Sequence, residues 1–282
     1  GALQDAIATN DLVMERCWDH ARGGLPNRFT ADWRNVDPIK RVDTHMHTME
    51  GVSAIYYATG DPRFLDRLNL LADTILNPMG VSGCYDAEHG CTHEMFNPDW
   101  TEFTELTHGN TNLGHVTEAG WFIAKLAAYT GDRRKLDLAK GLVDWAIRYG
   151  YDEQLGGLFD YARPDGHVVS DIKTWWNQAE LLGALAFLYR LTGEESYLVR
   201  LEHHLAFIEQ YQLDNEYGEW YMALEADGSL SQRRREGADA KGSRWKAAYH
   251  VIQGLVHACN DLRRAAGVLP VAEGKSWADY SL

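Results

Sequence analysis

Apolar residues recur every three or four positions along much of the chain, and several of these periodic segments end in the same way. Three of them close on Thr-Gly followed by an acidic residue. Glycine is favoured just after a helix because it readily adopts the left-handed conformation that ends one, and an acidic residue suits the first turn of the next helix. The pattern therefore predicts three helices that are each followed at once by another. The three segments are SAIYYATGD (53–61), AKLAAYTGD (124–132) and LAFLYRLTGE (185–194).

The segments after these turns again carry apolar residues at i, i+3, i+4 and i+7, which is typical of amphipathic helices. They span 62–76, 133–150 and 195–212, and a fourth copy runs over 245–267. The sequence thus repeats a helical hairpin with a long return loop about every 60 to 70 residues.

The return loops at 150–166 and 213–228 contain glycine turns between short alternating runs, which predicts small β-hairpins. No strand pattern is long enough for a central sheet, and no Gly/Ser linker divides the chain. We therefore expect one all-α domain over 1–282. Helical hairpins of this period arranged in a ring form an α/α toroid, whose inner helices line a cavity. Such rings close with six or seven hairpins and about four are visible, so the ring is expected to be open.

Composition narrows the range of partners. The chain has 27 Lys and Arg against 41 Asp and Glu, a net charge of −14, which disfavours binding to nucleic acid or an acidic membrane. No stretch approaches the roughly 18 apolar residues of a membrane span. The first residues lack the basic and apolar regions of a signal peptide, so we expect a cytoplasmic protein. The four cysteines form no CxxC pair, and Cys84 and Cys91 are either bridged across a loop or free thiols.

Residues suited to chemistry gather at the start of the first helix in each repeat. Glu118 and Glu180 each lie twelve residues before the threonine of their turn, so they occupy the same place in their helices. If the hairpins surround a common axis, these residues converge on one mouth of the cavity. The set comprises His45, His47 and Glu50; His115, Glu118 and Trp121; Trp175, Trp176 and Glu180; and Trp245, Tyr249 and His250.

Two chemistries fit such a set. The spacing from His115 to Glu118 puts both side chains on one helix face, as in di-iron bundles, but those sites need further carboxylates and give tryptophan no role. We therefore expect no metal. Neutral imidazoles with a pKa near 6.5 suit proton transfer, with Glu118 tuning His115, and tryptophan faces suit stacking on a sugar ring.

Several further histidines and tryptophans are interpreted as structural. His203 and His204 are placed on a charged helix face, and Trp18, Trp33 and Trp145 in the core or in packing contacts.

Several motifs resemble those of the N-acylglucosamine 2-epimerase family, which includes cellobiose 2-epimerases and mannose isomerases. The similarity runs from about residue 20 to 262. It rests on DTHMHTMEGVSAIYYATGD (43–61), HEMFNPDW (93–100), GHVTEAGWFI (114–123), KTWWNQAELLGALAFLYRLTG (173–193), YGEWY (217–221) and WKAAYH (245–250). The resemblance implies an (α/α)6 barrel and C2 epimerisation or aldose–ketose isomerisation of unmodified sugars, with neither metal nor organic cofactor.

The resemblance also implies roles for individual residues. His250 and His115 would be the acid–base pair, and His47 would bind or polarise the carbonyl end of the sugar. Glu118 would support the histidines, and Trp176 and Trp245 would stack on the substrate. Asp43 stands where the family usually has Asn, which alters hydrogen bonding to the sugar, and Glu180 completes the expected substrate-binding set.

The family's first two hairpins have no counterpart in the chain, nor has the arginine on them that contacts the reacting oxygens. A second copy of the chain could cover the open side of the ring.

We therefore expect a cofactor-independent sugar 2-epimerase or isomerase that acts on a mono- or disaccharide through a cis-enediolate. One alternative is a toroidal glycoside hydrolase or lyase that uses Glu118 and Glu180 as its carboxyl pair. Another is a non-catalytic carbohydrate-binding module. The sequence does not distinguish which sugar is bound.

Overall fold

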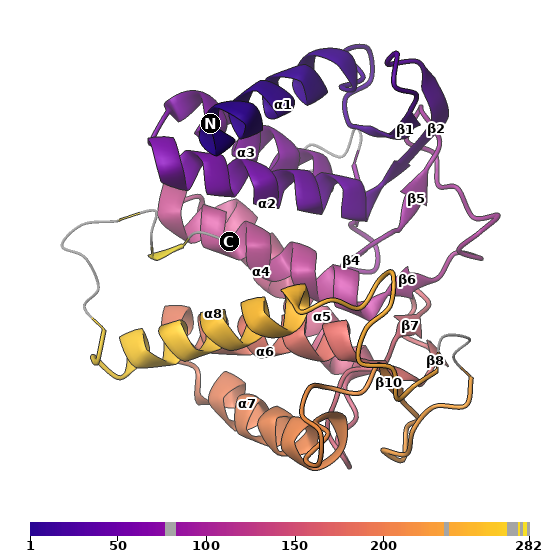
Figure 1. Ribbon diagram of the computed structural model, residues 1–282, viewed down its shortest axis with the longest axis vertical. Coiled ribbons are helices and arrows are strands. Elements are labelled where there is room, and N and C mark those ends of the chain that lie inside the picture. Colours follow the sequence, from indigo (N-terminus) through magenta and orange to yellow (C-terminus); the bar gives the residue numbers. More distant parts are fainter. Residues whose placement is uncertain (77–82, 234–236, 270–275, 277–278, 281–282) are drawn as a thin grey trace. The chain divides into compact units, whose positions relative to one another are not determined.

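The helices follow one another as the sequence predicts. A computed structural model describes residues 1–76, 83–233, 237–269, 276 and 279–280. Within that part of the chain there are eight α-helices and one π-helical turn, shown in Figure 1. They are α1 (Ala2–Arg16), α2 (Val42–Thr59), α3 (Pro62–Leu76), α4 (Leu113–Thr130), α5 (Arg133–Gly150), α6 (Trp175–Thr192), α7 (Glu195–Phe207), η1 (Ile208–Gln212) and α8 (Tyr249–Ala265).

The chain divides into two compact units. The first comprises residues 1–111, 122–139 and 272–282, and the second comprises 112–121 and 140–271. That the whole chain is one domain stays a prediction.

The glycine turns end helices as expected. Gly60, Gly131 and Gly193 have φ of 64°, 79° and 70°, in the left-handed region. Each donates its N–H to a carbonyl four residues earlier, at 2.8 Å in all three turns. The turns confirm the hairpins α2–α3, α4–α5 and α6–α7. In the described residues α8 has no second helix, so three complete hairpins stand where about four were predicted.

Short strands connect the hairpins. The predicted hairpin turns at 150–166 and 213–228 are present, with bridges that pair Tyr151 with Leu158 and Leu213 with Trp220. Strands β2, β6 and β9 run directly into α2, α4 and α6, so they fix where each of these helices starts. The strands are β1 (Pro26–Phe29), β2 (Asn35–Arg41), β3 (Tyr85–Asp86), β4 (Cys91–Thr92), β5 (Met95–Phe96), β6 (Thr111–Asn112), β7 (Tyr161–Ala162), β8 (Val168–Ser170), β9 (Lys173–Thr174) and β10 (Ala223–Leu224).

Buried lysines tie two of these strands to the turns that follow α1 and α5. Lys40 on β2 and Lys173 on β9 have fully buried side chains, and they reach the carboxylates of Asp19 and Asp152 at 3.0 and 2.6 Å. Each aspartate also accepts two backbone N–H groups of its own turn. Removing one partner of a buried pair typically costs about 3–5 kcal/mol, because the other charge is left uncompensated. The ties therefore hold the strand before α2 and the strand before α6 in place.

The core contains two histidines that carry no exposed surface. His204 was expected on a charged face, and this is wrong, because its ring is buried and its Nε2–H donates to the carbonyl of Gln178 at 2.9 Å. His45 donates from Nδ1 to the carbonyl of Arg41 and accepts the N–H of Leu25 at Nε2. Burial lowers the pKa of both imidazoles to about 4, so both are neutral at pH 7.

Burial corrects one further expectation and confirms another. Trp145 lies in the core as predicted, whereas Trp33 does not, since it is 41% exposed.

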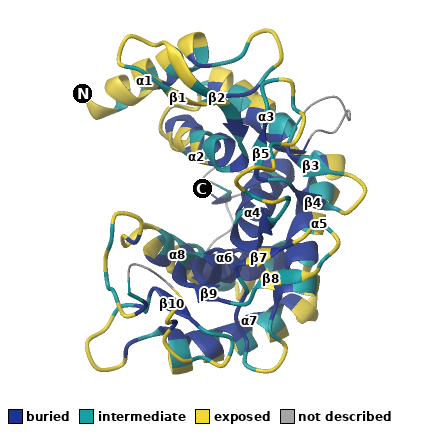
Figure 2. Cartoon of the chain, turned by 90° about the vertical axis from the view of Figure 1, so that its right-hand side faces the viewer, coloured by how far each residue is buried: buried dark blue, intermediate teal, exposed yellow. Residues whose placement is uncertain are grey.

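The four cysteines are free thiols. Most residues of α6 are buried, as Figure 2 shows. Among the described residues, no helix has the length and apolar character needed to cross a bilayer.

The buried histidines predict acid sensitivity of the fold. Below a pH of about 6.5 the unfolded chain binds a proton at His204, whereas the folded ring stays neutral until about pH 4. The free energy of unfolding should therefore fall by about 1.4 kcal/mol per pH unit over this window on account of His204. Urea unfolding of wild type and His204→Gln at several pH values checks this, with His203→Gln as the control. The expectation fails if the pH slope of His204→Gln equals that of wild type.

Candidate active site

Several predicted site residues of the second unit lie at the starts of α4 and α6. One buried carboxylate, that of Asp160, accepts hydrogen bonds from both helix starts. Asn112 accepts the N–H groups of Gly114 and His115 at 2.8 and 3.2 Å, which caps α4. Asp160 accepts hydrogen bonds from Asn112 and, at the head of α6, from Thr174 and Asn177, at 3.3–3.4 Å. The two helix starts are thus held side by side.

Two glycines allow the helices to approach closely. A Cβ at Gly114 would clash with Asn177 and lie 2.6 Å from the ring of Trp176. A Cβ at Gly254, one turn after His250, would clash with the backbone of Ala179 on α6. The glycine before His115 and the glycine after His250 therefore serve the packing of α4 and α8 against α6.

The two histidines predicted as acid and base share a tryptophan neighbour. The ring centroids of His115 and Trp176 are 5.0 Å apart, and those of His250 and Trp176 are 5.5 Å apart. The three rings come from α4, α6 and α8, which lie far apart in the sequence. The structure therefore brings together His115, Trp176 and His250, as the sequence predicts.

His250 is oriented by a buried carboxylate. Its Nδ1 lies 2.6 Å from Oε1 of Glu180, and Oε2 of Glu180 accepts the indole N–H of Trp121 at 3.0 Å. The side chain of Glu180 is 1% exposed and that of His250 is 17% exposed. An ionised carboxylate can only accept, so the neutral imidazole must carry its proton on Nδ1. Nε2 of His250 then has the lone pair that a general base requires.

Glu118 completes the cluster. It is fully buried on α4, and Glu118, Glu180 and His250 each offer one ligand atom within 4.8 Å of the others. These three groups could hold a divalent cation. Both oxygens of Glu180 also accept hydrogen bonds, from His250 and Trp121.

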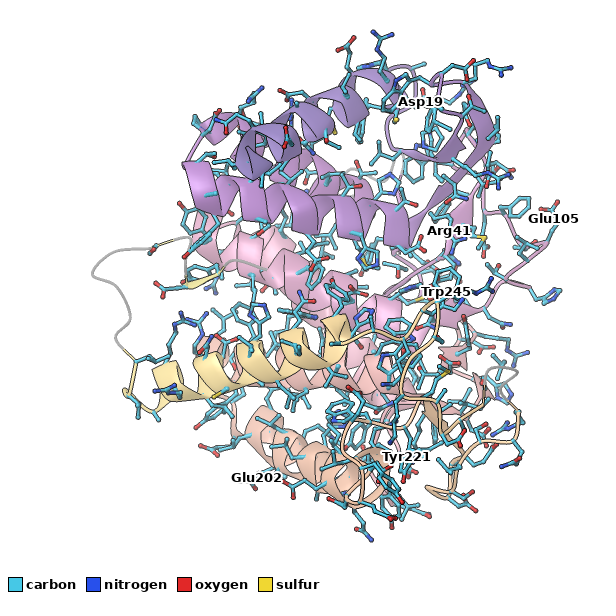
Figure 3. The ribbon with its side chains drawn as sticks, in the orientation of Figure 1. Asp19, Arg41, Glu105, Glu202, Tyr221 and Trp245 are labelled. Carbon is cyan, nitrogen blue, oxygen red and sulfur yellow. The ribbon has the colours of Figure 1, made fainter. Side chains whose placement is uncertain are left out.

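The remaining predicted residues lie elsewhere. Asp43 and His47 are on α2 in the first unit, where Asp43 forms a bidentate pair with Arg41 at 3.0 Å. His47 is half-exposed, and its Nδ1 lies 3.5 Å from Glu50. Their roles stay predictions. Trp245 is 68% exposed on the loop that leads into α8 and is labelled in Figure 3.

Sequence reasoning missed Asp160 and gave Trp121 no function. Trp121 donates to Glu180 and is itself in edge-on contact with the ring of His257 on α8, at 5.3 Å. Its position one turn after Glu118 was the feature of the sequence that could have indicated that Trp121 belongs to the site. Asp160 follows a strand-like run in a return loop, and no spacing marks it out.

Comparisons with known proteins show the family to which the chain belongs. Residues 2–253 match the family described as N-acylglucosamine 2-epimerase (GlcNAc 2-epimerase), and the chain belongs to this family. It is 26% identical to D-mannose isomerase of Marinomonas mediterranea, over 86% of this chain and 62% of that protein. It is 24% identical to cellobiose 2-epimerase of Bacteroides fragilis, over 88% and 63%.

The fold agrees as well. A crystal structure of D-mannose isomerase superimposes with a TM-score of 0.81 at 25% identity, over 92% of this chain and 66% of that one. The likeness confirms the predicted class, an α/α toroid of helical hairpins. The chain spans less than two thirds of the length of these relatives.

Replacing Glu180 with Gln tests the orientation of His250. An amide offers one acceptor and one donor group, so it cannot accept from both Trp121 and His250. We expect the Nδ1–H tautomer of His250 to lose its dominance, with a loss of stability of about 1–3 kcal/mol from the unsatisfied donor. Nitrogen-15 NMR of the histidines and chemical unfolding measure the two effects. Glu202→Gln, on an exposed face of α7, is the control; equal tautomer populations in wild type and Glu180→Gln would contradict the assignment.

Proposed function

We propose that this protein is a sugar 2-epimerase or aldose–ketose isomerase in which His115 and His250 move the proton at C2. The observation that carries the proposal is the placement of both imidazoles beside one tryptophan, with ring centroids 5.0 and 5.5 Å from that of Trp176. A sugar stacked on that indole has its reacting carbons within reach of both rings. Membership of the epimerase family supports the same reaction class.

The reaction begins with the open-chain aldose. One histidine removes the proton from C2, and the electron pair of that C–H bond forms the C1–C2 double bond while the carbonyl electrons move to O1, giving a cis-enediolate. Return of a proton to the opposite face of C2 by the second histidine gives the epimer. Delivery to C1 instead, with transfer of the O2 proton, gives the ketose. Epimerisation therefore needs two bases, and isomerisation needs one.

Glu180 prepares His250 for this role. When Nε2 of His250 takes a proton, the imidazolium lies 2.6 Å from the carboxylate that already holds Nδ1–H. The buried negative charge stabilises the ion, in the way that the aspartate of a Ser-His-Asp triad stabilises its histidine. Glu118 is close enough to add to this field.

Binding of the sugar is assigned to further residues of the chain. Trp176 stacks on the reacting end, and the exposed Trp245 covers it or a second ring. His47 polarises the carbonyl, and Asp43 with its partner Arg41 contacts hydroxyls. The names of the relatives point to mannose, cellobiose or an N-acylglucosamine as the kind of substrate, a mono- or disaccharide.

The alternative enzyme class has weaker support. An inverting glycoside hydrolase needs carboxyl groups about 6.5–9.5 Å apart. One oxygen of Glu118 and one of Glu180 lie within 4.8 Å, which is shorter than the separation that an inverting hydrolase uses. Hydrolysis also gives no task to the paired histidines.

Removing either imidazole tests the proposal. His250→Ala and His115→Ala should each lower C2 proton exchange on the face that the missing ring serves by at least a hundredfold, because general acid–base catalysis commonly contributes 10²–10⁴-fold. Proton NMR in D2O with mannose, glucose, fructose, cellobiose and N-acetylmannosamine measures the exchange. Circular dichroism checks that the variants fold, and His167→Ala on an exposed loop is the control. Full exchange in both folded variants would refute the assignment.

Metal removal gives a second test. The proposed chemistry needs no Lewis acid, and both oxygens of Glu180 are engaged without one. Dialysis against EDTA should leave the exchange rate within about twofold of the untreated enzyme, well below the tenfold that 1.4 kcal/mol of lost stabilisation would produce. Loss of exchange that Mn²⁺ or Zn²⁺ restores would instead place an ion among Glu118, Glu180 and His250.

A further inference from the structure

The tip of the β1–β2 hairpin holds a tryptophan in a backbone conformation that suits glycine. Trp33 has φ of 64° and donates its N–H to the carbonyl of Thr30 at 2.9 Å. Thr30 in turn donates to the carbonyl of Arg34 at 2.9 Å. This is a turn followed by a left-handed bulge residue, where Gly or Asn is favoured and a bulky side chain is strained.

A second turn of the same kind serves as an internal comparison. Trp100 has φ of 69°, with hydrogen bonds between Asn97 and both Trp100 and Thr101 that match those of the Trp33 turn. Its indole N–H donates to the carbonyl of Arg22 at 2.8 Å, and Lys40 lies 4.7 Å from the ring centroid. The strain at Trp100 is therefore offset by contacts that its side chain makes.

Trp33 has no such compensation in the part of the chain that the structure describes. Its side chain is 41% exposed, and its indole makes neither a ring contact nor a hydrogen bond there. Strained backbone that local contacts do not explain tends to mark functional positions. A ligand that uses the indole would supply the missing contacts.

Trp33 lines a pocket of about 500 Å³. Two further aromatic side chains line it, Trp18 and Phe29, together with Arg22 and Asn35. The volume lies within the range of small-molecule sites, which combine aromatic walls with a few polar groups.

The walls of this pocket are fixed by a buried ammonium group. Nζ of Lys40 donates to the carboxylate of Asp19 at 3.0 Å and to the carbonyl of Pro98 at 2.8 Å, and both acceptors belong to residues that line the pocket. Figure 3 labels Asp19. The side chain of Lys40 is fully buried, so the two walls are held in a preformed arrangement that lowers the cost of binding.

We infer that this pocket is a second saccharide-binding site, in which a pyranose ring stacks on Trp33. The apolar face of a sugar matches an indole, and the guanidinium of Arg22 and the amide of Asn35 suit its hydroxyls. With the carboxylate of Asp19 engaged by Lys40, the polar lining offers mainly donors, which suit the hydroxyl oxygens of a sugar. The inference rests on the proposed function only in taking a sugar as the ligand.

The test uses glycosides that cannot open and so are not turned over. Protein labelled with 5-fluorotryptophan is titrated with methyl α-D-mannopyranoside and methyl β-cellobioside. The Trp33 resonance is assigned as the one that is missing in the spectrum of Trp33→Gly. We expect this resonance to show a saturable fluorine-19 shift with at least one of the two glycosides. Calorimetry should show binding at this site weakened at least tenfold in Trp33→Gly. Its melting temperature should equal or exceed that of wild type, because glycine relieves the strain.

Two controls separate the possible failures. His250→Ala should keep the Trp33 shift, so loss of sugar exchange and loss of this site are distinguishable. Trp100→Gly should lower the melting temperature, because that indole packs. The inference is overturned if no glycoside shifts Trp33 up to its solubility limit. It is also overturned if Trp33→Gly lowers the melting temperature and leaves glycoside binding unchanged.

Discussion

The arrangement of the site depends on one buried carboxylate. Glu180 has almost no exposed surface, and a carboxylate is tolerated there only if its oxygens are well paired. Trp121 from α4 and His250 from α8 supply one donor each, so a single side chain on α6 links three helices. The orientation of His250 follows from this requirement.

A second carboxylate and two glycines make that linkage possible. Asp160 holds the starts of α4 and α6 beside one another, and so it positions His115 next to Trp176. Gly254 lets α8 approach the backbone of α6 closely enough for His250 to reach Glu180. The buried pair of Lys173 and Asp152 anchors the strand that leads into α6. The first helix of each repeat thus carries its chemical residues at its start, and polar ties fix the starts of α2, α4 and α6.

Local features of the chain were open to prediction from the sequence. The apolar period fixed the bounds of α3 and α5 at 62–76 and 133–150, and the glycine turns fixed the ends of α2 and α6. The same repeats showed that His115, Trp176 and His250 would meet, because equivalent positions of stacked hairpins lie at the same level.

What could not be predicted depends on contacts between distant residues. Glu180 and His250 are 70 positions apart, and nothing in the spacing of either repeat specifies their hydrogen bond. The predicted helix at 195–212 ends in a π-helical turn at Ile208–Gln212, and the burial of His204 beside Gln178 follows from packing against α6. The strain at Trp33 could not be predicted either, because the presence of a tryptophan in a turn does not indicate its φ angle.

The central claim is that Trp176 presents a sugar to His115 and His250 together. A crystal structure of the protein with a hexitol, which mimics the open chain of the sugar but cannot react, tests this most directly. The account predicts the polyol against the face of Trp176, with the carbon that corresponds to C2 within about 3.5 Å of a ring nitrogen of each histidine, the distance of a near-attack arrangement. A polyol bound in this protein with its carbons out of reach of both histidines would contradict it.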